Sequence, residues 1–127
     1  MLTSSSLIAF VATADLHRAR RFYEDVLALE LVEQSDFACV FDAAGTMLRV
    51  TLADPVVAAG YTVLGWSVDD IGRCVEALTA NGVTFTRYDG MDQDAAGIWR
   101  TPGGDQVAWF ADPDGNTLSL TQFGTRQ

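Results

Sequence analysis

Few side chains in this sequence are of the types that carry acid–base, nucleophilic or metal chemistry. The only histidine is His17, and the sequence places no partner that would orient its imidazole as a general base. Cys39 and Cys74 lie at apolar positions of a predicted strand and a predicted helix, which indicates buried thiols rather than a disulfide. No Cys-x-x-Cys or His–Cys spacing typical of zinc sites is present. We therefore predict no catalytic residue and no metal site from these motifs.

Two polar loops have a partial likeness to ion-binding motifs. The acidic loop 89–97 contains Asp92 and Asp94, but it lacks the glycine placement of a calcium loop. The pair Gly103 and Gly104 could suggest phosphate binding. No helix follows this pair, however, and the flanking strand patterns favour a hairpin turn. Neither loop is predicted to bind an ion.

Charge and hydropathy limit the partners of the chain. Its 127 residues include 17 Asp and Glu, no Lys and 8 Arg, so the net charge is −9. Such acidity argues against nucleic-acid binding, and it either favours cationic ligands or simply keeps the protein soluble. No apolar run is long enough to predict a membrane span, and the segment 1–7 lacks the features of a secretory signal. We expect a cytoplasmic protein.

The elements that would position these residues occur twice. The spacing of Asp42, Gly45 and Leu48 recurs 70 positions later, within the segment Trp109-Phe-Ala-Asp-Pro-Asp-Gly-Asn-Thr-Leu. Helical patterns open at Asp15 and again 54 positions later. The sequence therefore predicts two copies of one unit, with about 16 additional residues inside the second copy.

Each copy is predicted to have the order strand, helix, strand, strand, strand. Strand patterns in the first copy cover 7–13, 29–32, 37–41 and 47–52. In the second copy five stretches fit a strand pattern, one more than this order holds: 61–68, 83–88, 98–101, 106–110 and 117–121. The helices begin at Asp15 and at Asp69 or Asp70, and Asn81-Gly82 ends the second. We expect a first module at 1–53, a linker at 54–60 and a second module at 61–127, in one compact structural unit.

The helical segment 15–27, the Val68-Asp69-Asp70 start of the second helix and the turn at 109–116 resemble the vicinal oxygen chelate superfamily. This superfamily holds glyoxalase I, extradiol dioxygenases and bleomycin-resistance proteins. The resemblance implies an α+β fold: two βαβββ modules whose eight strands form a cup-shaped mixed sheet, with the helices on the outside. Ala28 stands where the family pattern usually has glycine. If this position needs a positive φ, alanine costs about 1 kcal/mol.

Metal-dependent members of the superfamily hold an ion on the concave face of four strands. The resemblance places these four ligand positions at Ile8, Arg49, Val63 and Ser119. Two of these side chains are aliphatic, one is a weak neutral hydroxyl, and a guanidinium would repel a cation. The resemblance therefore implies that the metal ligands are not retained, and we expect neither a metal nor another cofactor.

Strand alternation would give the cup an apolar lining with a few polar groups. The expected ligand-binding residues are Phe10, Met47, Arg49, Val63, Ser67, Trp99, Trp109 and Ser119. A guanidinium in an apolar cup needs a partner, because an unpaired buried charge is costly. For Arg49 this partner could be a ligand carboxylate or phosphate, an internal acidic side chain, or water. Trp99 and Trp109 could equally belong to the core.

These features favour a metal-free small-molecule binding protein of the glyoxalase/bleomycin-resistance type, which would sequester a drug or metabolite. The alternative is a glyoxalase-like lyase or isomerase, or a dioxygenase-related enzyme, with displaced metal ligands. A metal-free reaction that uses Tyr23, Tyr61 or His17 also stays open, as does an interaction module whose cup is filled by its own side chains. The resemblance implies a homodimer and leaves open whether each cup forms within a chain or across the dimer.

Overall fold

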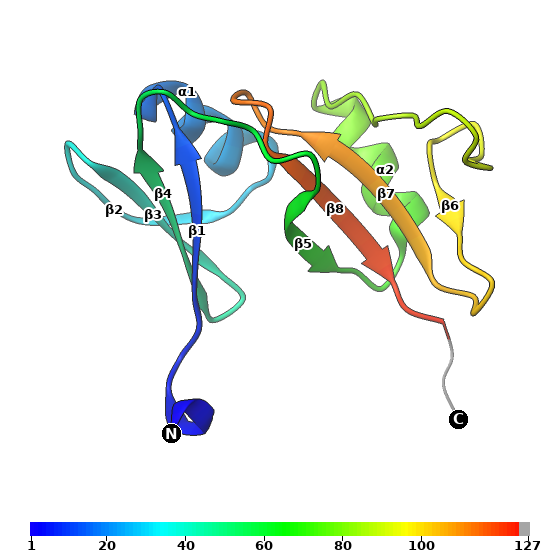
Figure 1. Ribbon diagram of the computed structural model, residues 1–127, viewed down its shortest axis with the longest axis horizontal. Coiled ribbons are helices and arrows are strands. Elements are labelled where there is room, and N and C mark those ends of the chain that lie inside the picture. Colours follow the sequence, from blue (N-terminus) through cyan, green and yellow to red (C-terminus); the bar gives the residue numbers. More distant parts are fainter. Residues whose placement is uncertain (125–127) are drawn as a thin grey trace. The chain divides into compact units, whose positions relative to one another are not determined.

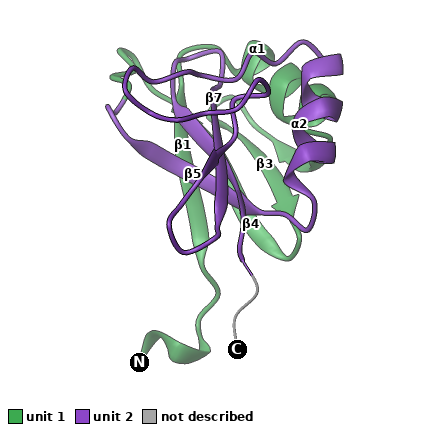
Figure 2. Cartoon of the chain, turned by 90° about the vertical axis from the view of Figure 1, so that its right-hand side faces the viewer, with its two compact units in different colours: residues 1–58 green, residues 59–127 purple. Residues whose placement is uncertain are grey.

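The computed structural model describes residues 1–124. The chain divides into two compact units, residues 1–58 and residues 59–127 (Figure 2). Each unit contains one four-stranded open sheet of mixed direction and one α-helix, so the expected α+β class with eight strands is confirmed (Figure 1). None of the helices within residues 1–124 is long and apolar enough to cross a membrane.

The sheet of the first unit has the strand order β1-β4-β3-β2. The strands are β1 (Ile8–Thr13), β2 (Glu30–Gln34), β3 (Ala38–Ala43) and β4 (Thr46–Leu52). β1 runs parallel to β4, and the other two pairs are antiparallel. A short 3-10 helix, η1 (Leu2–Ser4), precedes the sheet.

The helix of the first unit begins as predicted and then changes its winding. Asp15 caps α1 (Leu16–Arg20) by accepting a hydrogen bond from the Arg18 backbone N–H at 3.1 Å. The chain continues as the π-helical segment η2 (Arg21–Val26), in which the Leu27 N–H donates to the Phe22 carbonyl at 3.0 Å. The sequence pattern predicted a single regular helix here, because apolar spacing does not distinguish a π turn from an α turn. The segment is followed by Ala28 at φ 59°, in the left-handed region.

The core of the first unit lies between this helix and one face of the sheet. Tyr23 is completely buried, and its ring centroid lies 5.9 Å from that of Phe41 on β3. The strands add buried apolar side chains to this layer, namely Val11, Cys39, Leu48 and Val50. The alternating pattern of β4 is therefore confirmed, with its even-numbered Leu48 and Val50 turned toward the helix.

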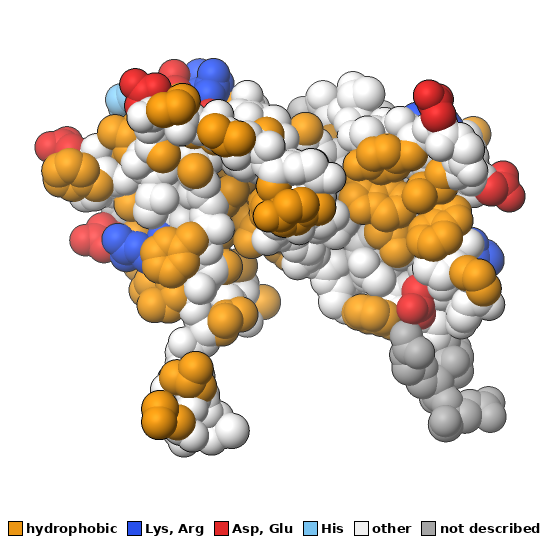
Figure 3. Space-filling view, in the orientation of Figure 1, with side chains coloured by type: hydrophobic (Ala, Val, Ile, Leu, Met, Phe, Trp, Pro, Cys, Tyr) orange, Lys and Arg blue, Asp and Glu red, His pale blue; other side chains and the backbone are white. Residues whose placement is uncertain are grey.

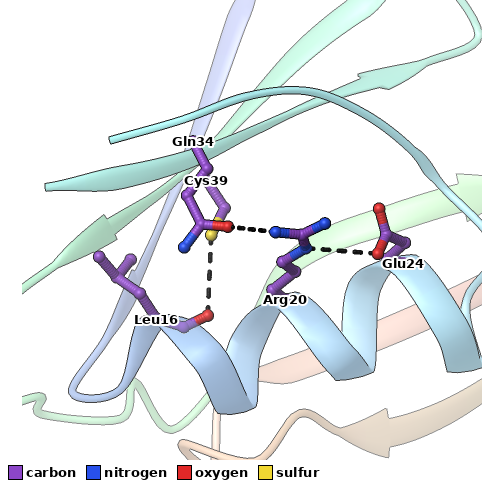
Figure 4. A network of polar contacts seen from close by, with 5 residues as sticks. All are labelled: Leu16, Arg20, Glu24, Gln34 and Cys39. Carbon is purple, nitrogen blue, oxygen red and sulfur yellow. Dashed lines mark hydrogen bonds and ion pairs between the residues drawn. The ribbon is translucent and has the colours of Figure 1, made fainter. Parts of the chain in front are cut away.

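Polar contacts join the helix to the sheet beside this core (Figure 4). Arg20 donates from Nη1 to Gln34 Oε1 at 2.7 Å and from Nε to Glu24 Oε1 at 3.3 Å. The Cys39 thiol donates to the Leu16 carbonyl oxygen at 3.7 Å. Burial raises the pKa of Cys39, as expected for a structural thiol.

The sheet of the second unit repeats this topology, with the strand order β5-β8-β7-β6. Its strands are β5 (Thr62–Ser67), β6 (Trp99–Arg100), β7 (Gln106–Ala111) and β8 (Thr117–Gln122). β5 is parallel to β8, just as β1 is to β4. The predicted internal repeat is thus visible as two sheets of equivalent strand order.

The helix of the second unit, α2 (Ile71–Ala80), covers one face of its sheet. The sequence allowed either of two aspartates as its cap, and the structure selects Asp70, which accepts from the Arg73 N–H at 3.1 Å. Gly82 follows the helix at φ 95°, the left-handed conformation predicted for the end of this helix. The helix packs its buried residues Ile71, Val75 and Leu78 toward the sheet side that carries Phe110 and Leu118.

The predicted strand at 83–88 does not form. Only Phe85 makes a bridge to β7, opposite Phe110, while β6 occupies the neighbouring stretch of the same strand edge. Beyond this point the Gln93 side chain replaces a strand partner: its amide donates to the Thr86 and Gly97 carbonyls, and its oxygen accepts from the Tyr88 N–H at 2.8 Å. The segment therefore folds as a closed loop.

Candidate functional site

Three of the predicted ligand-binding residues lie together on the face of the first sheet that the helix does not cover. Phe10 on β1 and Arg49 on β4 are paired in register, and Met47 lies two residues before Arg49 on the same face. Phe10 is 60% exposed, and Met47 borders a hollow of about 570 Å³ together with Ile8 and Val40. Strand alternation places Leu48 and Val50 on the opposite, buried face. Besides these apolar side chains, the cross-strand row of this face carries Arg49 on β4 and the exposed Glu33 on β2, the register partner of Val40.

Arg49 is half-buried between apolar neighbours. On the two adjacent strands its register partners are Phe10 and Val40. Within residues 1–124, the Arg49 guanidinium makes no hydrogen bond or ion pair with another side chain or with the backbone. An internal carboxylate partner, which the sequence left possible, is therefore not present in the described chain. The guanidinium is available to water or to an anionic ligand group.

The other predicted residues lie in the second unit, mostly on the corresponding face of its sheet. Ser119 on β8 is paired in register with Gly65 on β5 and with Trp109 on β7. Ser67 lies two residues along β5 from Gly65, beside Thr121. The β5–β8 register shifts between positions 62 and 64, so Val63 lies within an irregularity and is partly exposed. The predicted set is thus divided between two units, three residues in the first and five in the second.

An aromatic cluster, Tyr88–Trp109–Trp99, lies on this face of the second unit. The Trp99 and Trp109 rings are stacked, with centroids 6.2 Å apart and planes at 30°. The Tyr88 ring meets Trp109 edge to face, at 5.4 Å and 88°. Figure 3 shows hydrophobic side chains gathered over β6 and β7. Both tryptophans are half-buried, so they line the surface of the sheet rather than its core.

A hollow of about 290 Å³ opens beside Trp109, entirely within the second unit. It is lined by Gly60, Tyr61, Thr62, Tyr88, Met91, Trp109 and Thr117. Tyr61 is 71% exposed and Tyr88 is 40% exposed, so their rings are open to a ligand. We refer to this cavity as the aromatic hollow.

Comparison with known proteins agrees with this fold. The family model for the glyoxalase/bleomycin resistance protein/dioxygenase superfamily matches residues 7–120. The chain belongs to this superfamily. No curated protein matches the chain.

Solved structures of glyoxalase-fold proteins align over nearly the whole chain. A superfamily member from Sphaerobacter thermophilus has 23% identity and a TM-score of 0.73, covering 97% of this chain and 100% of its own. Lactoylglutathione lyase from Agrobacterium tumefaciens has 21% identity and a TM-score of 0.72, with coverages of 94% and 93%. A superfamily protein from Alicyclobacillus acidocaldarius has 17% identity and a TM-score of 0.75, with coverages of 96% and 93%. At such low identity these likenesses show the shared glyoxalase fold.

The four positions at which the resemblance places superfamily metal ligands hold poor donors for a divalent ion. Ile8 and Val63 have no donor atom, Ser119 offers a neutral hydroxyl, and Arg49 carries a positive charge. Within residues 1–124, no group of three or more His, Cys, Asp or Glu side chains is placed to hold a metal ion. His17 is exposed in the first turn of α1. The side chains of this superfamily member therefore do not fit the divalent ion that its metal-dependent relatives use.

Sequence reasoning missed three walls of the aromatic hollow, namely Tyr61, Tyr88 and Met91. Tyr61 precedes β5 with the same parity as Val63, which was a signal in the strand pattern. Tyr88 and Met91 belong to the loop that the Gln93 side chain closes by hydrogen bonds. No local sequence pattern predicts that these hydrogen bonds form. Tyr23, a candidate for metal-free chemistry, belongs to η2, is completely buried beside Phe41 of the sheet and is closed to a substrate.

Proposed function

We propose that this superfamily member binds an organic small molecule directly, without a metal, and sequesters it as a drug- or metabolite-binding protein. The observation that carries this proposal is the aromatic hollow, where Tyr61, Tyr88 and Trp109 border one cavity. Aromatic rings offer large apolar contact areas with little conformational freedom to lose. Open aromatic walls of this kind are typical of ligand sites rather than of a closed core.

The size of the hollow sets the size of the group it would hold. Its volume of about 290 Å³ is close to the lower end of ligand pockets, which span roughly 300–1,000 Å³. It would therefore receive one ring or one branched head group in an open depression, and the remainder of a larger ligand would extend over the open sheet face. Ser67 and Trp99, with the partly exposed Val63, are the residues that this face offers, whereas Ser119 is buried between its neighbours.

The first unit would supply a second, separate contact through Arg49. Phe10 and Met47 provide apolar surface beside the guanidinium, which has no partner within residues 1–124. A ligand carboxylate or phosphate could accept two parallel hydrogen bonds from it. We assign Arg49 the role of anion contact within the proposed ligand-binding set.

A thermal-shift screen of drug-like and metabolite compounds, followed by titration of tryptophan fluorescence, tests the proposal. Trp109→Leu should weaken the best compound about tenfold or more, since it removes one wall of the hollow. Trp66→Leu is the matched control, because Trp66 pairs with Leu120 on the opposite face of β5. Equal loss in both variants, or no compound that raises the melting temperature, would reject ligand binding at this hollow.

Elemental analysis of the purified protein tests the metal-free part separately. We expect binding of the screened compound to persist after dialysis against a chelator, because the residues at the expected ligand positions are poor donors. Stoichiometric zinc, nickel, iron or manganese whose removal abolishes binding would point instead to an enzyme with displaced ligands.

We also propose a homodimer, as the superfamily resemblance implies. Exposed apolar side chains such as Val32 and Phe37 in the first unit support an association surface. Sedimentation equilibrium measures the mass directly, and a monomer at concentrations well above those in the binding assays would contradict the proposal.

A further inference from the structure

We propose that the aromatic hollow recognises an organic cation, of the quaternary or protonated alkylammonium class. The inference rests on the proposed ligand-binding function and adds the charge and chemical class of the group held in the second unit. It depends on the ring arrangement, on the lack of a basic side chain in the lining, and on the acidic residues that follow two lining residues in the sequence.

The rings are arranged as two meeting walls. Tyr88 and Trp109 stand at 88° to each other with centroids 5.4 Å apart, and both line the same cavity. The Trp99 ring is stacked on Trp109, with centroids 6.2 Å apart, and supports its position. Tyr61 adds a third aromatic ring to the lining. The negative faces of aromatic rings attract a cation through their quadrupoles, and several rings around one cavity are suited to ammonium groups.

The lining of the hollow contains no basic side chain. Its non-aromatic members are Gly60, Thr62, Met91 and Thr117, of which Met91 is polarizable and the threonines are neutral. Arg87 directly precedes Tyr88, but its Nη2 donates to the carbonyl oxygens of Asp94 and Ala95 at 2.6 and 2.9 Å. This cation is thus bound to the backbone on another part of the loop.

Two acidic residues are sequence neighbours of residues that line the hollow. Asp89 follows Tyr88, Asp92 follows Met91, and both are exposed. Residues 59–127 contain 9 Asp and Glu against 4 Arg, a net charge of −5 for the second unit. A negative surface raises the local concentration of a cation and speeds its arrival, whereas the rings would provide the short-range recognition. An anionic group has no partner in this lining, and Arg49 belongs to the other unit.

A matched pair of probes isolates the charge. Choline and 3,3-dimethylbutan-1-ol have nearly the same shape, but only choline is charged. Titration of the full chain, followed by backbone amide chemical shifts, should give an affinity for choline about tenfold tighter than for the neutral alcohol. The largest shift changes should lie at residues 60–62, 88–91 and 109.

Variants at exposed ring positions test the walls without disturbing the core. Tyr88→Leu and Tyr61→Leu should each reduce choline affinity severalfold, while Tyr88→Phe, which keeps the ring, should preserve most of it. The double change of Asp89 and Asp92 to asparagine should weaken binding less than Tyr88→Leu and should reduce its salt dependence. If the aspartate changes abolish binding while Tyr88→Leu does not, the acidic loop alone attracts cations and the inference is wrong.

The outcomes separate this inference from the function on which it rests. Equal affinity for choline and the alcohol would overturn cation recognition and leave an apolar ligand site. No binding of either probe, with other screened compounds still dependent on Trp109, would also overturn it and leave the proposed function intact. Should Tyr88→Leu fail to fold, Tyr61→Leu gives the same decision, because Tyr61 is 71% exposed.

Discussion

Gly65 on β5 and Ser119 on β8 face each other so closely that a Cβ built on Gly65 would lie 2.9 Å from the Ser119 hydroxyl oxygen. Ser119 is only 7% exposed, so its hydroxyl has little room to turn away. We expect Gly65→Ala to lower the free energy of unfolding by about 1–2 kcal/mol, through overpacking. Urea denaturation measures this. In the double variant with Ser119→Ala much of the loss should be recovered, and purely additive losses would show that the two side chains do not meet.

Ala28 is predicted to be a site of backbone strain. Its φ of 59° lies in the left-handed region, where a Cβ is unfavourable. We expect Ala28→Gly to raise the free energy of unfolding by about 0.5–1 kcal/mol, since the strain relieved exceeds the added freedom of the unfolded chain. Ala77→Gly, at an exposed position in the middle of α2, is the control and should destabilise by about 1 kcal/mol. If Ala28→Gly also lowers the free energy of unfolding, as Ala77→Gly should, the backbone at Ala28 is not strained.

The two aspartates before α2 should differ in their effect. Asp70 accepts from the Arg73 N–H at 3.1 Å, whereas neighbouring Asp69 lies outside the helix. Asp70→Ala should therefore cost about 1 kcal/mol, as the loss of an N-cap usually does, and Asp69→Ala should cost much less. Thermal unfolding followed by circular dichroism compares the two. A larger loss at Asp69 would show that the cap is misassigned.

Acid should weaken the first helix through Asp15. The hydrogen bond from the Arg18 backbone N–H lowers the pKa of Asp15 below its ordinary value of 3.8. A depressed pKa in the folded state gives stability that is present above the ordinary value and is lost as the pH falls through the folded one. The wild type should thus lose stability relative to Asp15→Asn as the pH is lowered past this range. The stability difference between the wild type and Asp15→Asn, measured by urea unfolding, should therefore shrink as the pH falls. Asp25→Asn changes the same charge but caps no helix, so its difference from the wild type should not shrink in this way.

Arg49 should govern the affinity of anionic compounds and of no others. Replacing it by methionine keeps the apolar stem and removes the guanidinium, so a carboxylate or phosphate compound from the screen should bind about tenfold more weakly. Arg100→Met, at an exposed position on β6, controls for the change in net charge. Isothermal titration gives both constants. If Arg49→Met binds the anionic compound as tightly as the wild type does, Arg49 does not contact the ligand and its side chain simply extends to water.

Local chemistry made much of this fold predictable. Asp15 and Gly82 mark helix ends that follow from short-range hydrogen bonding and backbone preference, and both stand where the sequence indicated them. The Asp112 turn is equally local: its carboxylate accepts from the backbone N–H groups of Asp114 and Asn116 at 3.0 and 2.9 Å. The predicted repeat appears in the structure as two sheets of equivalent strand order.

The parts that sequence reasoning missed depend on contacts between segments. The residues at 83–88 have a good strand pattern, but β6 and Phe85 share the edge of β7, so only one bridge forms there. The aromatic hollow requires Tyr61 and Tyr88, 27 positions apart in the chain, to border one cavity. Ring proximity of this kind follows from the closed loop, and no periodicity encodes it.

The connection between helix and next strand spans residues 27–29 in the first unit but 81–98 in the second. The longer connection carries Tyr88 and Met91, and it is held shut by the side chain of Gln93. The second unit thus has an additional segment, outside its four-stranded sheet, that forms one wall of the aromatic hollow and could be replaced. A randomised library confined to 88–92 would exchange the chemistry of that wall. It would keep Gln93, Arg87 and the Asp94 carboxylate, which accepts from the Ala96 and Ile98 N–H groups, so the loop should stay closed and this segment is the natural place to engineer new ligand preferences.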